Sequence, residues 1–163
     1  MEYFRSCNLK DIEELQRISQ TAYTEAFCGL LNSDDVKEYI KSKYSLDHIK
    51  KEFEEPSNHF LFFYIDDHAV GYMKYTLKTD SLEIDRLYML QDFKGMGAGS
   101  KFMGKAEELA RLNGKNALTL GVLALNKPAI LFYEKRGFQQ YSSETVQIGQ
   151  NDYQLLLMKK ELE

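Results

Sequence analysis

The segment at residues 81–111 constrains the fold more than any other part of the chain. It joins a stretch of alternating apolar and polar residues, 80–90, to the glycine-rich turn KGMGAG at 94–99. After the turn, apolar residues recur at helical spacing up to about Asn113, which predicts an amphipathic helix. A strand, a glycine-rich turn and a helix in this order predict an α/β fold.

The turn at residues 94–99 is suited to bind an anion. Because a helix leaves its first backbone N–H groups unpaired, a glycine-rich turn that opens a helix presents donors and a positive dipole to a phosphate. No window of the chain matches the Walker loop, and the dinucleotide fingerprint is matched only in part, with no acid about 20 residues on. A pyrophosphate site is the hypothesis, and a loop that only reverses the chain is the alternative.

The other elements predict a mixed sheet in a single domain. With two prolines, no Gly/Ser-rich linker and no repeat, residues 1–163 are expected to form one unit. Hydrophobic spacing predicts helices at 11–27, from 32, at 45–55 and at 126–136, and strands at 2–6, 59–65, 69–77, 117–123, 138–147 and 153–158.

Strand 80–90 is expected to alternate along its whole length, with each second side chain on the same face. One face would carry Leu82, Ile84, Arg86 and Tyr88, and the other Glu83, Asp85, Leu87 and Met89.

Composition excludes several classes of function. Hydrophobic residues make up 44% and aromatic residues 13%, which fits a packed core rather than a disordered chain. A formal net charge of −4 with no basic stripe argues against direct nucleic-acid binding. No apolar run approaches the roughly 20 residues that span a bilayer, and no signal peptide is recognised, so we expect a cytoplasmic protein with no membrane partner. The two cysteines and three histidines have no ligand spacing, so no metal is expected.

A second motif follows the strand at 117–123. Asn126, Ala129 and Tyr133 are spaced N-x-x-A-x-x-x-Y, and Gly137 and Phe138 come next. Asn126 and Tyr133 are seven residues apart and therefore lie about two turns apart on one helix face. A capping Asn and a core Tyr are each common, but their combination downstream of the glycine-rich turn favours one shared site.

The two motifs resemble those of the GCN5-related N-acetyltransferase (GNAT) superfamily. The family turn reads Q/R-x-x-G-x-G/A, and residues 94–99 match it in both glycine places, while Lys94 stands where the family has Gln or Arg. The resemblance is strongest over residues 58–138. Residues 81–88 (SLEIDRLY) and 21–27 (TAYTEAF) further resemble bacterial Pai-type spermidine/spermine N-acetyltransferases.

The resemblance implies a GNAT fold, which is a mixed, mostly antiparallel sheet of six or seven strands flanked by helices. Two splayed parallel strands, here 80–90 and 117–123, would hold acetyl-CoA as cosubstrate. Main-chain groups of 87–89 would pair with its pantetheine arm, and residues 94–99 would hold its pyrophosphate. The implied cofactor-binding residues are Leu87, Tyr88, Met89, Lys94, Gly95, Met96, Gly97, Ala98, Gly99, Asn126, Phe132, Tyr133 and Lys135.

The implied reaction is direct attack of a primary amine on the thioester. Because an alkylamine has a pKa near that of lysine, roughly 10.4, it is mostly protonated at neutral pH and a base must take its proton. Glu83 is the expected base, directly or through water, with Asp85 as a second carboxylate that attracts the cation, and Tyr133 as proton donor to the leaving thiolate. Two solvated strand carboxylates and a packing Tyr are the alternatives.

The expected acceptor is a small-molecule amine, in particular a polyamine such as spermidine or spermine. Acidic and aromatic side chains suit a flexible polycation, and the candidates are Tyr23, Glu25, Phe27, Asp34 and Asp35. The N-terminal helices and the hairpin before the last strand are expected to set specificity. Another amine (a protein N-terminus, a lysine or another small molecule) and a non-catalytic CoA-binding regulator are the alternative functions. Monomer and homodimer both stay open.

Overall fold

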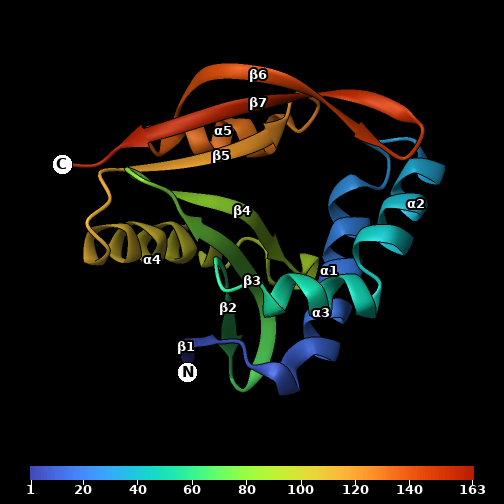
Figure 1. Cartoon of the computed structure of the whole chain (residues 1–163), viewed down its shortest axis with the longest axis horizontal. Helices are drawn as coiled ribbons and strands as arrows, with labels where there is room; N and C mark the ends of the chain where they lie inside the picture. The colour runs from blue at the N-terminus through green and yellow to red at the C-terminus, as the bar shows by residue number, and fades with distance from the viewer.

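The computed structural model describes residues 1–163, and its seven strands form one sheet in the order β1-β2-β3-β4-β5-β7-β6 (Figure 1). Only β4 and β5 run parallel; every other neighbouring pair is antiparallel. The strands are β1 (Glu2–Ser6), β2 (Asn58–Ile65), β3 (His68–Leu77), β4 (Ser81–Met89), β5 (Ala117–Leu123), β6 (Gln139–Ile148) and β7 (Asn151–Glu161). The predicted mixed, mostly antiparallel sheet is confirmed.

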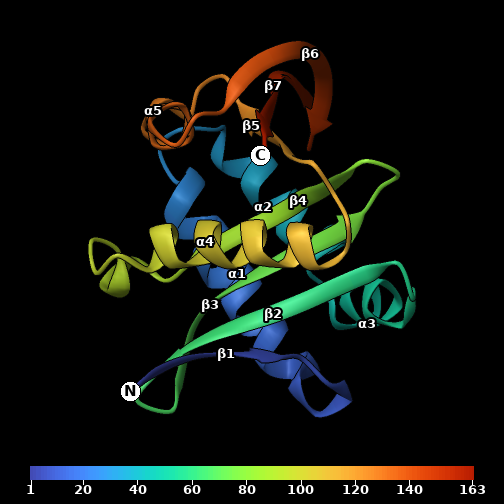
Figure 2. The same ribbon diagram turned by 90° about the vertical axis from the view of Figure 1, so that its left-hand side faces the viewer.

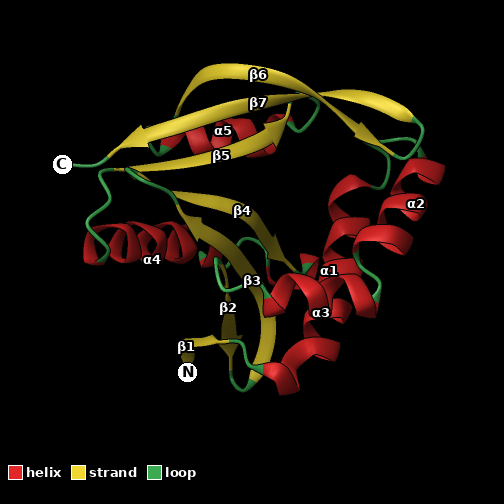
Figure 3. Cartoon of the chain, in the orientation of Figure 1, coloured by secondary structure: helices red, strands yellow, loops and turns green.

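Helices cover both faces of this sheet (Figures 2 and 3). They are α1 (Ile12–Phe27), α2 (Ser33–Lys43), α3 (Leu46–Glu54), α4 (Ala98–Leu112) and α5 (Lys127–Lys135), with short 3-10 turns at Leu9–Asp11 and Gln91–Phe93. The buried side of α4, including Phe102 and Ala106, packs on one face of the sheet. The opposite face packs against α1, α2 and α3 around Tyr23, Tyr44 and Phe62. Figure 2 shows α4 in front of the central strands and α1 behind them.

A β-bulge at Asp85 changes which residues of β4 share a face. On β3, Tyr75 pairs with Ile84 and Lys74 with Arg86, so Asp85 has no partner in the ladder. An extra residue in one strand reverses the alternation beyond it. The prediction of one shared face is therefore wrong beyond the bulge: the α4 core takes Leu82 and Ile84, whereas the α1–α3 side takes Arg86 and Tyr88.

The parallel pairing of β4 with β5 is short. Only 81–84 pairs with 117–120. Beyond that point β5 stays on β7 as far as Leu123, while β4 stays on β3 as far as Met89. The two strands therefore splay apart (Figure 1), which leaves the free edge of 85–89 without a strand partner.

The closing hairpin is longer than the sequence indicates. Strand β7 continues to Glu161, because Lys159, Lys160 and Glu161 pair with the first residues of β5. Their charged side chains break the apolar alternation on which the prediction of an end at Met158 depended. Neighbouring strand pairing, rather than local pattern, sets this strand's length.

Candidate active site

A cavity of about 710 Å³ lies where β4 and β5 diverge. Residues from α1, α2, β4, β5, α5, the N-terminus of α4 and the β6–β7 hairpin line it. The lining includes these predicted site residues: Tyr23, Glu25, Phe27, Asp85, Leu87, Tyr88, Met89, Lys94, Gly99, Asn126, Phe132 and Tyr133. It does not include Asp34, Asp35, Glu83, Gly95, Met96, Gly97, Ala98 or Lys135.

The N-terminus of α4 forms one end of the site. Gly97 precedes the helix with φ of +79°, a left-handed conformation that favours glycine. No side chain caps this helix, and its first turn holds no acidic residue. Its first N–H groups have no intrahelical partner, and Lys94 adds a positive charge in the cavity lining. Donors and charge at this end fit a pyrophosphate.

Helix α5 forms another part of the cavity wall. The side chain of Asn126 caps α5 by accepting a hydrogen bond from the Ala129 N–H at 3.4 Å, and it also lines the cavity. Burial raises the pKa of Tyr133 to about 12, although the nearby Arg136 guanidinium opposes the shift. A Cβ at Gly99 would lie 2.9 Å from the Phe132 ring, so α4 and α5 approach this closely because residue 99 is glycine.

The two predicted carboxylates of β4 have different surroundings. Asp85 lines the cavity, and its carboxylate lies 3.3 Å from Lys74 Nζ. Burial raises the pKa of Asp85; Lys74 opposes this shift and the charge of Glu83 adds to it. Glu83 lies outside the cavity lining, 3.4 Å from Lys78 Nζ, with 38% of its side chain exposed against 24% for Asp85. Of these two carboxylates, only that of Asp85, the residue at the bulge, therefore reaches the cavity.

The opposite end of the cavity has an aromatic wall from α1 and α2. Tyr23 stacks on Tyr39 with ring centroids 4.5 Å apart, and Phe27 lies 4.7 Å from Tyr23. The buried Tyr23 hydroxyl has no hydrogen-bond partner. Glu25 accepts a hydrogen bond from the Gln91 N–H at 2.9 Å, which links α1 to the segment after β4. An aromatic wall with a carboxylate suits an apolar chain that carries positive charge.

Sequence reasoning missed Arg86 and the hairpin residues of this site. Arg86 lines the cavity, forms an ion pair with Glu52 at 2.6 Å and lies 5.0 Å from the centre of the Tyr44 ring. The hairpin was expected to set specificity, but no local pattern identifies which of its side chains face inward. The structure places these in the lining: Val146, Gln147, Ile148 and Leu155.

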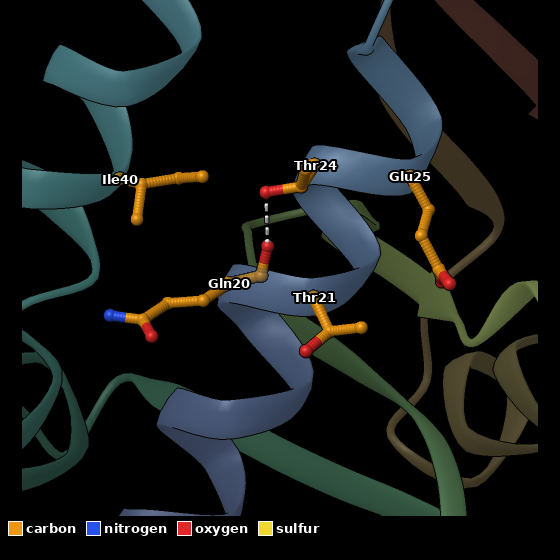
Figure 4. A pocket seen from close by; sticks show the side chains of 5 residues that line it. All are labelled: Gln20, Thr21, Thr24, Glu25 and Ile40. Carbon is orange, nitrogen blue, oxygen red and sulfur yellow. Dashed lines mark hydrogen bonds between the residues drawn. The ribbon is translucent and has the colours of Figure 1, made fainter.

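A smaller depression of about 410 Å³ lies between α1 and α2 (Figure 4). Four of the five residues that line it are polar, and the Thr24 hydroxyl donates to the Gln20 carbonyl at 2.8 Å. Glu25, which it shares with the larger cavity, lies on the other side of α1 from Ile40 in Figure 4. No group of three or more His, Cys, Asp or Glu side chains is placed to hold a metal ion. None of the helices has the length and apolar character needed to cross a membrane.

Splayed parallel strands, an uncapped helix N-terminus and a cavity between them are the arrangement expected of an acyltransferase that uses coenzyme A. The chain matches the acetyltransferase (GNAT) family over residues 13–138. The chain belongs to this family, and its activity is N-acetyl transfer with acetyl-CoA as cosubstrate. The predicted family, fold and cosubstrate are confirmed.

Relatives and solved structures agree with this assignment. The chain is 28% identical to an uncharacterized N-acetyltransferase from Lactobacillus delbrueckii subsp. lactis, over 94% of this chain and 93% of the relative. It is 22% identical to the spermidine N(1)-acetyltransferase of Thermoplasma acidophilum, over 83% of this chain and 86% of the relative. The fold matches the crystal structure of the PaiA N-acetyltransferase from that organism in complex with coenzyme A, with a TM-score of 0.80, 21% identity and 99% of both chains covered.

Proposed function

We propose that the chain acetylates a primary amine of a polyamine such as spermidine or spermine. One observation carries this proposal: the cavity lining combines the carboxylates of Glu25 and Asp85 with the aromatic wall of Tyr23, Phe27 and Tyr39. We call the part of the cavity that these residues line the acceptor half. Carboxylates attract ammonium groups, and aromatic faces pack against the methylene segments between them.

The guanidinium of Arg86 does not oppose a cationic substrate. Arg86 lines the cavity, but it is already paired with Glu52 at 2.6 Å, and only 11% of its side chain is exposed. Asp85 is likewise paired, with Lys74 at 3.3 Å, so Glu25 gives the acceptor half its net negative charge. The relative named as a spermidine N(1)-acetyltransferase supports the same substrate class.

Acetyl-CoA, when bound, supplies an acetyl group activated as a thioester. In this proposal residues 94–99 hold its pyrophosphate, and the free edge of 87–89 pairs with its pantetheine arm. Asn126 and Phe132, which line the cavity, would flank the arm, and Lys135, outside the lining, would add positive charge near the phosphates. Lys94 contributes a point charge where Arg would make a planar two-point contact.

Asp85 is the proposed base that takes the proton from the amine. It lines the cavity and its pKa is raised by burial, and a base whose pKa lies closer to neutral pH transfers protons more effectively. Glu83 was the expected base, but it lies outside the cavity lining. Its charge instead contributes to the raised pKa of Asp85, because two nearby carboxylates disfavour double ionisation.

A thiol-release assay tests the proposal. The purified protein and acetyl-CoA are incubated with spermidine, spermine, lysine peptides or aminoglycosides, and we expect turnover with the polyamines. Turnover confined to other amines would favour the alternative acceptors, and tight coenzyme A binding without any turnover would favour a non-catalytic regulator. In the active enzyme, Asp85→Asn should lower kcat far more than Glu83→Gln. A cytoplasmic location and the choice between monomer and homodimer stay predictions.

A further inference from the structure

We infer that Asp35 is a positioning residue for the acceptor amine, because it holds the tip of the β6–β7 hairpin against α2 and so fixes one wall of the acceptor half. Asp35 is not in the cavity lining and acts only through the hairpin. The inference rests on the proposed function for which half of the cavity takes the amine.

The carboxylate of Asp35 is built into a network whose donors all come from the hairpin. Only 1% of Asp35 is exposed. Its Oδ1 accepts from the Gln150 N–H at 2.9 Å, and its Oδ2 accepts from Asn151 Nδ2 at 2.6 Å and Tyr153 Oη at 2.7 Å. These hydrogen bonds also keep the pKa of Asp35 below its ordinary value, with Asn151 contributing most. No lysine, arginine or histidine forms an ion pair with it, so the hairpin donors and the N-terminus of α2, in whose first turn Asp35 lies, compensate the buried charge.

The backbone of the hairpin turn is shaped to meet α2. Gly149 has φ of +62°, and a Cβ there would lie 2.4 Å from Asp35 Oδ1 and 2.6 Å from its Cα. Beside it, Gln150 Nε2 donates to the Glu38 carboxylate at 3.1 Å. The Tyr153 hydroxyl donates to Asp35 and also accepts from the Asn32 N–H at 3.4 Å, at the start of α2. The contact therefore satisfies polar groups on both elements.

The tip of the hairpin has no neighbouring strand outside the hairpin, although Ile148 is buried in the core on the α1–α3 side and Val146 packs against it. β7 pairs with β5 only from Leu155 onward, and β6 is the edge strand of the sheet. Residues 146–154 extend beyond the end of β5 toward α2 (Figure 1), with a single main-chain hydrogen bond from Ala124 to Gln154. The cavity wall formed by 146–148 lies within this extension, since each of its residues pairs with one of 151–153. Its position therefore depends on this apolar packing and on the polar contact with Asp35.

The cofactor end of the site lies on other elements. The turn at 94–99 and α5 are separate in the chain from the extension at 146–154, and no hydrogen bond joins them to it. Loss of the Asp35 contact should therefore weaken binding of the amine and leave binding of acetyl-CoA almost unchanged. A general loss of stability would not separate the two substrates in this way.

The experiment compares Asp35→Ala with Asp152→Ala, which removes an exposed carboxylate of the same hairpin that has no hydrogen bond to α2. KM for the polyamine and for acetyl-CoA are measured separately, together with amide hydrogen exchange. We expect Asp35→Ala to raise the polyamine KM at least about tenfold and to change the acetyl-CoA KM by less than about twofold. Faster exchange should be confined to residues 146–154, and Asp152→Ala should resemble the wild type.

Equal rises in both KM values, or unchanged exchange of the hairpin, would overturn the inference. If Asp35→Ala does not fold, Tyr153→Phe and Asn151→Ala carry the same test, since each leaves the carboxylate two donors. A wild-type enzyme that acetylates only another amine would refute the polyamine proposal, and the two KM values are then compared with that amine. If coenzyme A binds and no amine is acetylated, the proposed function and the amine-positioning role both fail, whatever the hairpin exchange shows.

Discussion

Replacing Tyr133 with Phe tests what this hydroxyl does for the sulfur that leaves in the reaction. Burial raises the pKa of Tyr133 to about 12, whereas an ordinary thiol has a pKa of about 8.5. Complete transfer of the Tyr133 proton to a thiolate is therefore uphill by roughly 3.5 pKa units, or about 5 kcal/mol. A hydrogen bond that leaves the proton on Tyr133 avoids this cost, and hydrogen bonds to charged groups contribute roughly 1.5–3 kcal/mol.

We therefore expect Tyr133→Phe to lower kcat by roughly 10- to 150-fold, with little change in the affinity for coenzyme A. A Phe ring at this position keeps the packing of the Tyr133 ring. The centroid of that ring lies 5.3 Å from the centroid of the Phe132 ring and 5.5 Å from that of the Phe138 ring. The assay is thiol release with saturating amine from about pH 6 to about pH 10, combined with a coenzyme A titration. Tyr141→Phe, at a position 59% exposed on β6, is the matched control.

Two results would refute this reasoning about Tyr133. A group with a pKa of about 12 stays protonated throughout the assay range, so wild-type kcat should show no alkaline decline that Tyr133→Phe removes. Such a decline would make Tyr133 a true proton donor with a much lower pKa. An equal loss of kcat and of coenzyme A affinity would instead make it a binding residue.

Three further changes have expected outcomes. Lys74→Met removes the cation that opposes the raised pKa of Asp85, so the acidic limb of kcat/KM should move to higher pH; a limb that does not move would argue against Asp85 as the base. Phe102→Ala empties a fully buried position of the α4 core and should cost about 3–5 kcal/mol, which calorimetry should show as a fall in Tm of roughly 6–20 °C. Glu52→Gln leaves the buried charge of Arg86 without its anion and should cost about 3–5 kcal/mol in urea unfolding, whereas a loss below about 1 kcal/mol would mean that solvent screens the pair.

The cofactor end could be predicted from the sequence because its determinants are local. A glycine-rich turn that opens a helix, and the Asn126–Tyr133 spacing on another helix, depend on nothing more distant than a few residues. The structure places Lys94, Gly99, Asn126 and Tyr133 around one cavity. Hydrophobic spacing likewise predicted the helices, and α1 begins one residue after the predicted start.

The acceptor half could be predicted only in part, because it depends on contacts between distant segments. Asp34 and Asp35 are adjacent in the sequence, but Asp34 is exposed at the start of α2 while Asp35 is buried against the hairpin. Asp35 accepts a hydrogen bond from the N–H of Gln150, which lies 115 residues away in the chain, and Asp34 does not. No local pattern carries that information.

The bulge at Asp85 shows how one such distant contact shapes the site. In a regular strand Arg86 would share a face with Leu82 and Ile84, and its charge would enter the apolar core under α4. An unpaired buried charge costs several kcal/mol, whereas the extra residue turns Arg86 to the other face, where Glu52 neutralises it. The same bulge comes directly after Ile84, the last residue of β4 that pairs with β5. It places the carboxylate of Asp85 in the cavity lining. Burial of Arg86 and placement of the proposed base are thus two consequences of one irregularity in β4.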